Sequence, residues 1–129
     1  MWKLLFLIVI LLGAAFYFPQ TRPVVQELFA PVVNPALTWQ TKGEMVQIGR
    51  ELESLNRQGS ELPTPGASFQ HWMEGRFMGG SKTDGWGVDY TLKVWRDSIG
   101  IVSNGPDREI GTADDIVHPV KLLQNDRRR

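Results

Sequence analysis

Acidic side chains gather in one short, glycine-containing segment, and their type and spacing suggest metal chemistry. Four of them fall within nine residues: Asp107, Glu109, Asp114 and Asp115. Gly105 and Gly111 allow the backbone to turn sharply, so that carbonyl oxygens can point inward as well. A hard cation such as calcium takes about six to eight oxygen ligands, whereas carboxylates crowded without a cation repel one another. The segment is therefore a candidate calcium site.

A solvated acidic turn accounts for the same composition equally well, because turns favour Asp and Gly for conformational reasons alone. The segment does not have the pattern of an EF-hand. Asp107 is followed by Glu109 and then by Gly111, and no acid stands at the closing position of that motif. The residues by themselves leave both interpretations open.

Other catalytic chemistry has little support. The only histidines are His71 and His118, too few for a zinc site or a histidine–carboxylate hydrolase. Neither Ser68 nor Ser81 stands in a G-x-S-x-G context. Residues 79–83 lack the first glycine and the preceding strand of a phosphate-binding loop, and we interpret them as a turn. We therefore expect no enzyme.

The composition narrows the function classes further. With 129 residues the chain has room for one domain and a tail. A formal net charge of zero gives no reason to expect nucleic acid as a partner. The absence of cysteine excludes disulfides and thiolate sites.

The first residues form an apolar run. Residues 4–18 contain no polar side chain except the Tyr17 hydroxyl, and Lys3 precedes them. A spanning helix needs about 20 apolar residues, with about 17 as the lower limit. We predict that residues 1–18 form an anchor that contacts the membrane through residues 2–18. A cleaved signal peptide is the alternative, because Gly13 and two alanines would suit a cleavage site.

The next segments divide into a stalk and a helix. Residues 19–35 contain four prolines, which predicts a stalk with at most a short helical piece around residues 24–29. Asn34 is a candidate N-cap, Pro35 takes the first helical position and Gly59 ends the helix. An apolar stripe at helical spacing runs along it: Met45, Ile48, Leu52 and Leu55.

The remaining pattern predicts a short helix and a small sheet. Residues 68–73 form the helix, with Phe69, Trp72 and Met73 facing inward. Apolar and polar residues alternate over residues 88–94, which predicts a half-buried strand. A turn at Arg96 and Asp97 leads to a strand over residues 99–103, and residues 116–123 form a third strand or an extended edge. We predict an α+β fold, with an amphipathic helix packed on a small antiparallel sheet.

Two elements of this region resemble a known family. Residues 84–90 (D-G-W-G-V-D-Y) look like the D-P-W-G-N-P-Y element of the major pseudopilin of type II secretion systems, a type IV pilin-like family. Residues 103–107 (S-N-G-P-D), with Gly111 and D-D-I at residues 114–116, look like its S-x-G-x-D-G … D-I loop. The resemblance covers about residues 37–118, in the same order and spacing. The prepilin processing motif and the glutamate of its apolar run have no counterpart here.

The resemblance implies a pilin-like fold with calcium held in the loop after the hairpin. Asp107, Asp114 and Asp115 match side-chain ligands, whereas Asn104 and Glu109 match positions that contribute backbone carbonyls. Trp86 and Tyr90 match core positions. The implied domains are an anchor over residues 1–18, a stalk over 19–35, a pseudopilin-like domain over 36–123 and a disordered basic tail over 124–129.

These observations predict a membrane-anchored, calcium-stabilised domain that acts through protein contacts and is related to type II secretion. We expect a single-pass protein of the bacterial inner membrane with its globular domain in the periplasm. The alternative is an exported module that binds a small ligand or a polysaccharide through its tryptophans, Trp95 above all, since Trp95 falls on the polar face of its strand. A hydrolase using the acidic loop and His118 is the weakest hypothesis, because nothing orients a base or a nucleophile there.

Overall fold

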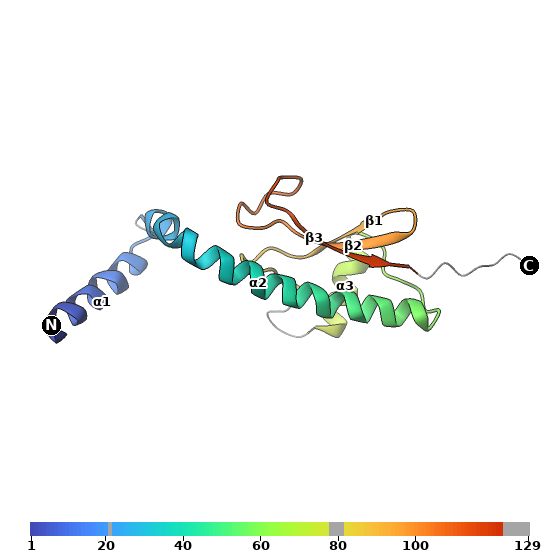
Figure 1. Ribbon diagram of the computed structural model, residues 1–129, viewed down its shortest axis with the longest axis horizontal. Helices are drawn as coiled ribbons and strands as arrows, with labels where there is room; N and C mark the ends of the chain where they lie inside the picture. The colour runs from blue at the N-terminus through green and yellow to red at the C-terminus, as the bar shows by residue number, and fades with distance from the viewer. Residues whose placement is uncertain (21, 78–81, 123–129) are drawn as a thin grey trace, which may run out of the picture. The chain divides into compact units, whose positions relative to one another are not determined.

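The computed structural model describes residues 1–20, 22–77 and 82–122 (Figure 1). The chain divides into two compact units, Met1–Ala36 and Leu37–Arg129. The helices and strands are α1 (Trp2–Tyr17), α2 (Arg22–Arg57), α3 (Ala67–Arg76), β1 (Thr91–Val94), β2 (Ser98–Ser103) and β3 (Ile116–Lys121). The predicted basic tail at residues 124–129 lies outside the described residues.

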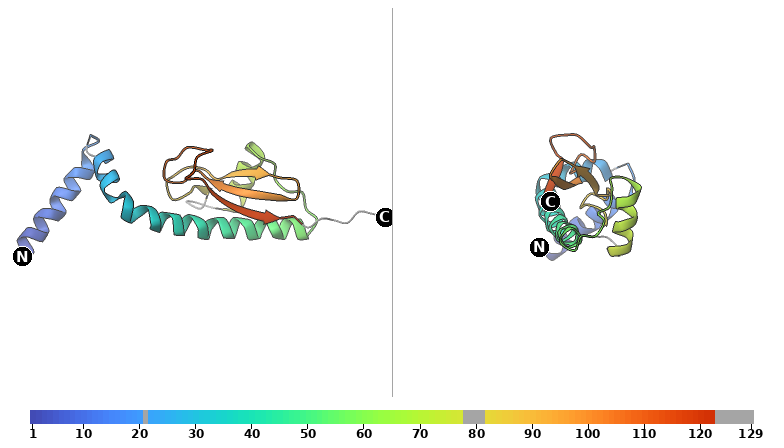
Figure 2. Two further views of the ribbon diagram at one scale, coloured as in Figure 1. Left: turned by 45° about the horizontal axis from the view of Figure 1, so that its top comes forward. Right: turned by 90° about the vertical axis from the view of Figure 1, so that its right-hand side faces the viewer.

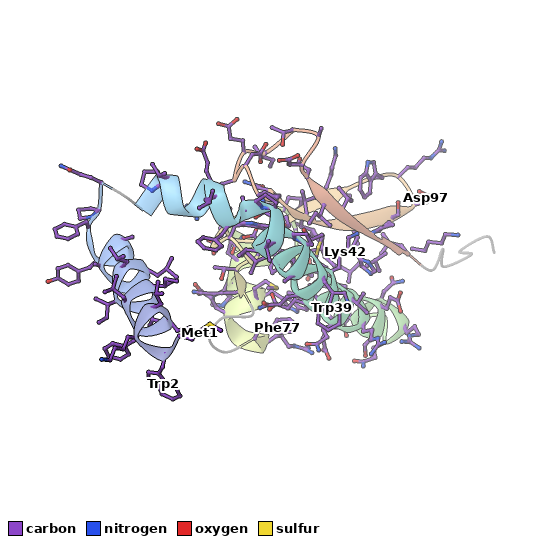
Figure 3. All side chains as sticks on the ribbon, turned by 60° about the vertical axis from the view of Figure 1, so that its left-hand side comes forward. Met1, Trp2, Trp39, Lys42, Phe77 and Asp97 are labelled. Carbon is purple, nitrogen blue, oxygen red and sulfur yellow. The ribbon has the colours of Figure 1, made fainter. Side chains whose placement is uncertain are left out.

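Helix α1 contains the apolar run, and its side chains project on all sides, Trp2 among them (Figure 3). It ends because Phe18 adopts an extended backbone, with φ −83° and ψ 120°, and Pro19 follows. Its 16 residues measure about 24 Å along the axis, short of the roughly 30 Å hydrocarbon core of a bilayer. None of the helices in the described residues is both long enough and apolar enough to cross a membrane. The prediction of a single-pass inner-membrane protein is therefore wrong.

Helix α2 corrects the prediction of a stalk with at most a short helical piece around residues 24–29. It begins at Arg22 and continues through Pro31 and Pro35, so that Asn34 lies inside the helix rather than at its N-cap. A proline has a φ of about −65°, which suits a helix, although it removes one backbone hydrogen bond and its ring crowds the carbonyl four residues earlier. The C-terminal end agrees with the prediction. Gly59 takes the left-handed conformation, with φ 69°, and the Ser60 N–H donates to the Leu55 carbonyl.

The sheet has three antiparallel strands in the order β1-β2-β3. The predicted turn at Arg96 and Asp97 is confirmed, because the Trp95 N–H donates to the Ser98 carbonyl across it. The first strand is shorter than predicted and begins only at Thr91. Val94, the last residue of β1 before the turn, is 53% exposed instead of buried. Pro119 lies within β3 opposite Gly100.

The core lies between the sheet and the two helices of the second unit, with α2 running along the sheet (Figure 2). The helices and all three strands contribute its buried side chains: Met45, Ile48, Leu52, Phe69, Met73, Tyr90, Leu92, Ile99, Ile101 and Val120. Burying each large apolar side chain stabilises the fold by roughly 1.5–3 kcal/mol. Gly49 brings α2 close to β3, since a Cβ at this position would lie 2.9 Å from Cδ2 and Nε2 of His118. The predicted α+β fold, a helix packed on a small antiparallel sheet, is confirmed.

Candidate metal centre

The acidic segment forms the loop that connects β2 to β3 at one end of the sheet (Figure 1). Its backbone turns at three residues in the left-handed region: Gly105 (φ 71°), Arg108 (φ 60°) and Gly111 (φ 84°). The Arg108 N–H donates to the Gly105 carbonyl at 3.1 Å. The two glycines therefore serve the turning role that the sequence predicts for them.

Two side-chain oxygens are buried inside this loop without a hydrogen-bond donor among the described residues, Oδ1 of Asn104 and Oδ1 of Asp115. The other polar atom of each side chain is paired. Nδ2 of Asn104 donates to the Arg108 carbonyl at 3.3 Å, and Oδ2 of Asp115 accepts from the Gly111 N–H at 2.7 Å. A buried acceptor without a partner costs about 1–3 kcal/mol. Asn104 is the first residue of the loop and Asp115 is its last.

The other predicted ligands do not turn inward. Asp107 is exposed, and its Oδ1 accepts from the Glu109 N–H at 3.0 Å. Hydrogen bonds from the Thr112 side chain and then from the Glu109 backbone lower the pKa of Asp107. The side chains of Glu109 and Asp114 are exposed. The Glu109 carbonyl accepts from Oγ1 of Thr112 at 3.3 Å, and the Asp114 carbonyl lies against the Cα of Gly105.

The structure therefore buries one side-chain oxygen of Asn104 and one of Asp115 in the loop, and it leaves the side chains of the other three predicted ligands exposed. Within residues 1–20, 22–77 and 82–122, no group of three or more His, Cys, Asp and Glu side chains could hold a metal ion. Calcium also takes amide and backbone carbonyl oxygens as ligands, and the loop contains oxygens of both kinds. The buried, unpaired oxygens of Asn104 and Asp115 suit an oxygen-ligated ion such as calcium better than the exposed acids of the loop do.

The carboxylate of Asp84 is buried next to the loop, and the sequence pattern did not predict this. Asp84 is 5% exposed, and its Oδ1 accepts from the N–H groups of Trp86 at 3.0 Å and Val88 at 2.9 Å. Its Oδ2 accepts from the Ser103 hydroxyl at 2.7 Å. The Ser103 oxygen in turn accepts from the Gly105 N–H at 3.2 Å. The D-G-W-G turn is thus connected to the first residues of the acidic loop.

The same turn is attached to helix α2. The Gly85 N–H donates to Oγ1 of Thr41 at 2.9 Å, and a Cβ at Gly85 would lie 3.0 Å from that oxygen and from Cβ of Leu37. A proline at position 85, as in the family element, could not donate this hydrogen bond. The sequence departs from the family element at the residue that makes this contact.

The four tryptophans of the second unit differ in exposure and in their contacts. The Trp95 ring, 38% exposed, covers Gly100, and Nζ of Lys93 lies 5.6 Å from its centroid. Trp72 stacks on Phe69 with their centroids 5.9 Å apart. Trp39 is 81% exposed on α2, and Trp86 is partly buried. They come from different parts of the fold: α2, α3, the D-G-W-G turn and the turn between β1 and β2.

The remaining candidate residues are placed as follows. His71 is exposed, whereas His118 is partly buried against Gly49. Residues 79–81 of the glycine-rich turn lie outside the described residues. Comparison of the chain with protein-family models, with curated proteins and with solved structures found no match.

Proposed function

We propose that this chain is a calcium-stabilised, pseudopilin-like domain that acts through protein contacts, of the kind used in type II secretion. Three features support the proposal together: the D-G-W-G element, the helix packed on a small antiparallel sheet, and an acidic loop that follows the first hairpin. The resemblance places calcium in that loop.

The observation that carries the proposal is the pair of buried oxygens without donors, one from Asn104 at the start of the loop and one from Asp115 at its end. Asn104 and Asp115 would hold the ion by side-chain oxygens. Backbone carbonyls of the loop would complete the oxygen set that calcium prefers. For Asp107 or Asp114 to join them, their exposed carboxylates would have to turn inward.

The role of the ion would be structural. A cation that binds the folded loop and not the unfolded chain stabilises the fold by linkage, by about 2.7 kcal/mol when its concentration is a hundred times the Kd. For a domain of this size such a gain raises the Tm by about 10 °C.

The test is thermal unfolding of the full chain in EDTA, in millimolar calcium and in millimolar magnesium. We expect a rise in Tm with calcium that magnesium does not match. Asp115→Ala should abolish the rise, because it removes one of the two buried oxygens. Glu109→Ala is the matched control, since it removes an acid of the same loop whose side chain is exposed, and it should keep the rise.

Equal Tm values in EDTA and in calcium would contradict the proposal. A calcium response that Glu109→Ala and Asp115→Ala reduce equally would also count against it, because general attraction to an acidic surface would then explain the effect.

A further inference from the structure

On the basis of the proposed function, we propose that Ser103 and Asp84 are positioning residues that set the calcium affinity of the loop without contacting the ion. Both are buried, and both lie before the loop in the sequence. Their hydrogen bonds end at Gly105, the second residue of the loop.

The direction of the hydrogen bonds follows from the groups involved. A serine hydroxyl has one proton and two acceptor lone pairs. Asp84 takes the proton, because its Oδ2 is an acceptor 2.7 Å from Oγ of Ser103. The lone pairs of Ser103 are then available to the Gly105 N–H, which lies 3.2 Å away. Asp84 therefore orients the hydroxyl, and the hydroxyl holds Gly105.

The position of Gly105 determines how the loop closes. The residue has a left-handed backbone, with φ 71°, and the Asp114 carbonyl lies against its Cα. Gly105 directly follows Asn104, and Asp114 directly precedes Asp115. The contact between Gly105 and Asp114 thus holds the two ends of the loop against each other, next to the two residues with buried oxygens.

Loss of the Ser103 hydroxyl would leave both the Asp84 carboxylate oxygen and the Gly105 N–H without this partner. The loop would then occupy its closed conformation for only part of the time, and the apparent Kd rises in inverse proportion to that fraction. One lost buried hydrogen bond corresponds to a roughly tenfold weaker Kd.

The experiment is isothermal titration of the full chain with calcium chloride. Ser103→Thr and Ser103→Val are compared, because the two introduced side chains have nearly the same shape and differ by the hydroxyl. We expect Ser103→Thr to bind calcium within about twofold of the wild type and Ser103→Val to bind about tenfold more weakly. If the larger valine side chain prevents folding, Ser103→Ala replaces this variant.

Thr41→Val is the matched control for a general loss of stability. It removes the hydrogen bond from Gly85 to Thr41, on the other side of the same turn, and leaves the bonds among Asp84, Ser103 and Gly105 intact. We expect Thr41→Val to lower the Tm while the calcium Kd stays at the wild-type value.

The outcomes separate this inference from the proposed function. A wild-type chain that binds no calcium overturns both. A wild-type chain that binds, with Ser103→Val as tight as Ser103→Thr, overturns the positioning role alone. A Thr41→Val variant that weakens binding as much as Ser103→Val overturns it too, because loss of stability would then account for the weaker affinity.

Discussion

The hydroxyl of Tyr90 donates a 2.8 Å hydrogen bond to Oε2 of Glu44, a residue 46 positions earlier in the chain. It joins the segment that enters β1 to helix α2. Tyr90 is fully buried, and its backbone carbonyl also accepts from Nε2 of Gln70 on α3 at 2.7 Å. Tyr90 therefore connects both helices of this unit to the sheet, in agreement with the core position that the family resemblance implies for it.

The tyrosine gives a pH dependence with a definite sign. Burial, and then the Glu44 carboxylate that accepts its proton, raise the pKa of Tyr90. Because the pKa is higher in the folded than in the unfolded protein, its contribution is complete below about pH 10, the ordinary tyrosine pKa, and is lost as the pH rises further. We expect the free energy of unfolding of the wild type to fall more steeply between about pH 9 and pH 11 than that of Tyr90→Phe. Urea denaturation at both pH values measures this, and equal slopes would contradict it.

The glycines of α2 provide a paired test of helix-to-sheet packing. A Cβ at Gly49 would lie 2.9 Å from the His118 ring, whereas nothing lies within 4 Å of a Cβ at Gly43. Gly43→Ala should stabilise the protein by up to about 1 kcal/mol through helix propensity. Gly49→Ala should lose that gain and cost about 1–3 kcal/mol, since the sheet must move away. Urea denaturation measures the free energy of unfolding of both variants. Equal changes in that free energy would contradict the prediction, because the His118 ring would then move aside without loss of stability.

The left-handed glycines of the acidic loop offer a second pair. Gly105 and Gly111 both have positive φ, but only a Cβ at Gly105 would collide with the Asp114 carbonyl. Gly111→Ala should cost about 1–2 kcal/mol, the penalty of a left-handed backbone for an L-residue. Gly105→Ala should cost more, and it should weaken any calcium-dependent rise in Tm. A calorimetric Tm for each variant, with and without calcium, tests this, and a larger loss for Gly111→Ala would count against the loop geometry.

Local patterns were enough to predict much of the fold. The apolar stripe from Met45 to Leu55 and the left-handed stop at Gly59 are properties of neighbouring residues, and both agree with the structure. The same kind of reasoning failed at Pro31 and Pro35, because a rule about single prolines does not show whether a helix continues beyond them. It failed for the membrane span because an apolar run does not show where its helix ends.

The site was harder to predict than the fold. Acidity and the family resemblance both pointed to Asp107, Glu109 and Asp114, whose side chains are exposed. The resemblance gave Asn104 a backbone carbonyl role only. Whether an oxygen is buried and without a donor depends on how the loop closes, which composition does not encode. Asp84 could have been suspected from the Asp-Gly pair, since Asp side chains often accept from backbone N–H groups a few residues ahead. Its bond to Ser103, 19 residues away, depends on tertiary structure.

Pro119 has a consequence for how the protein behaves at high concentration. It lies within β3, which is an edge strand of the three-stranded sheet. The open edge of a sheet normally presents a row of unpaired backbone N–H and C=O groups, with which a strand of a neighbouring molecule can pair. A proline has no N–H to offer an incoming strand, and natural sheets use it in this way. The chain therefore carries its own obstacle to growing into a fibril along β3.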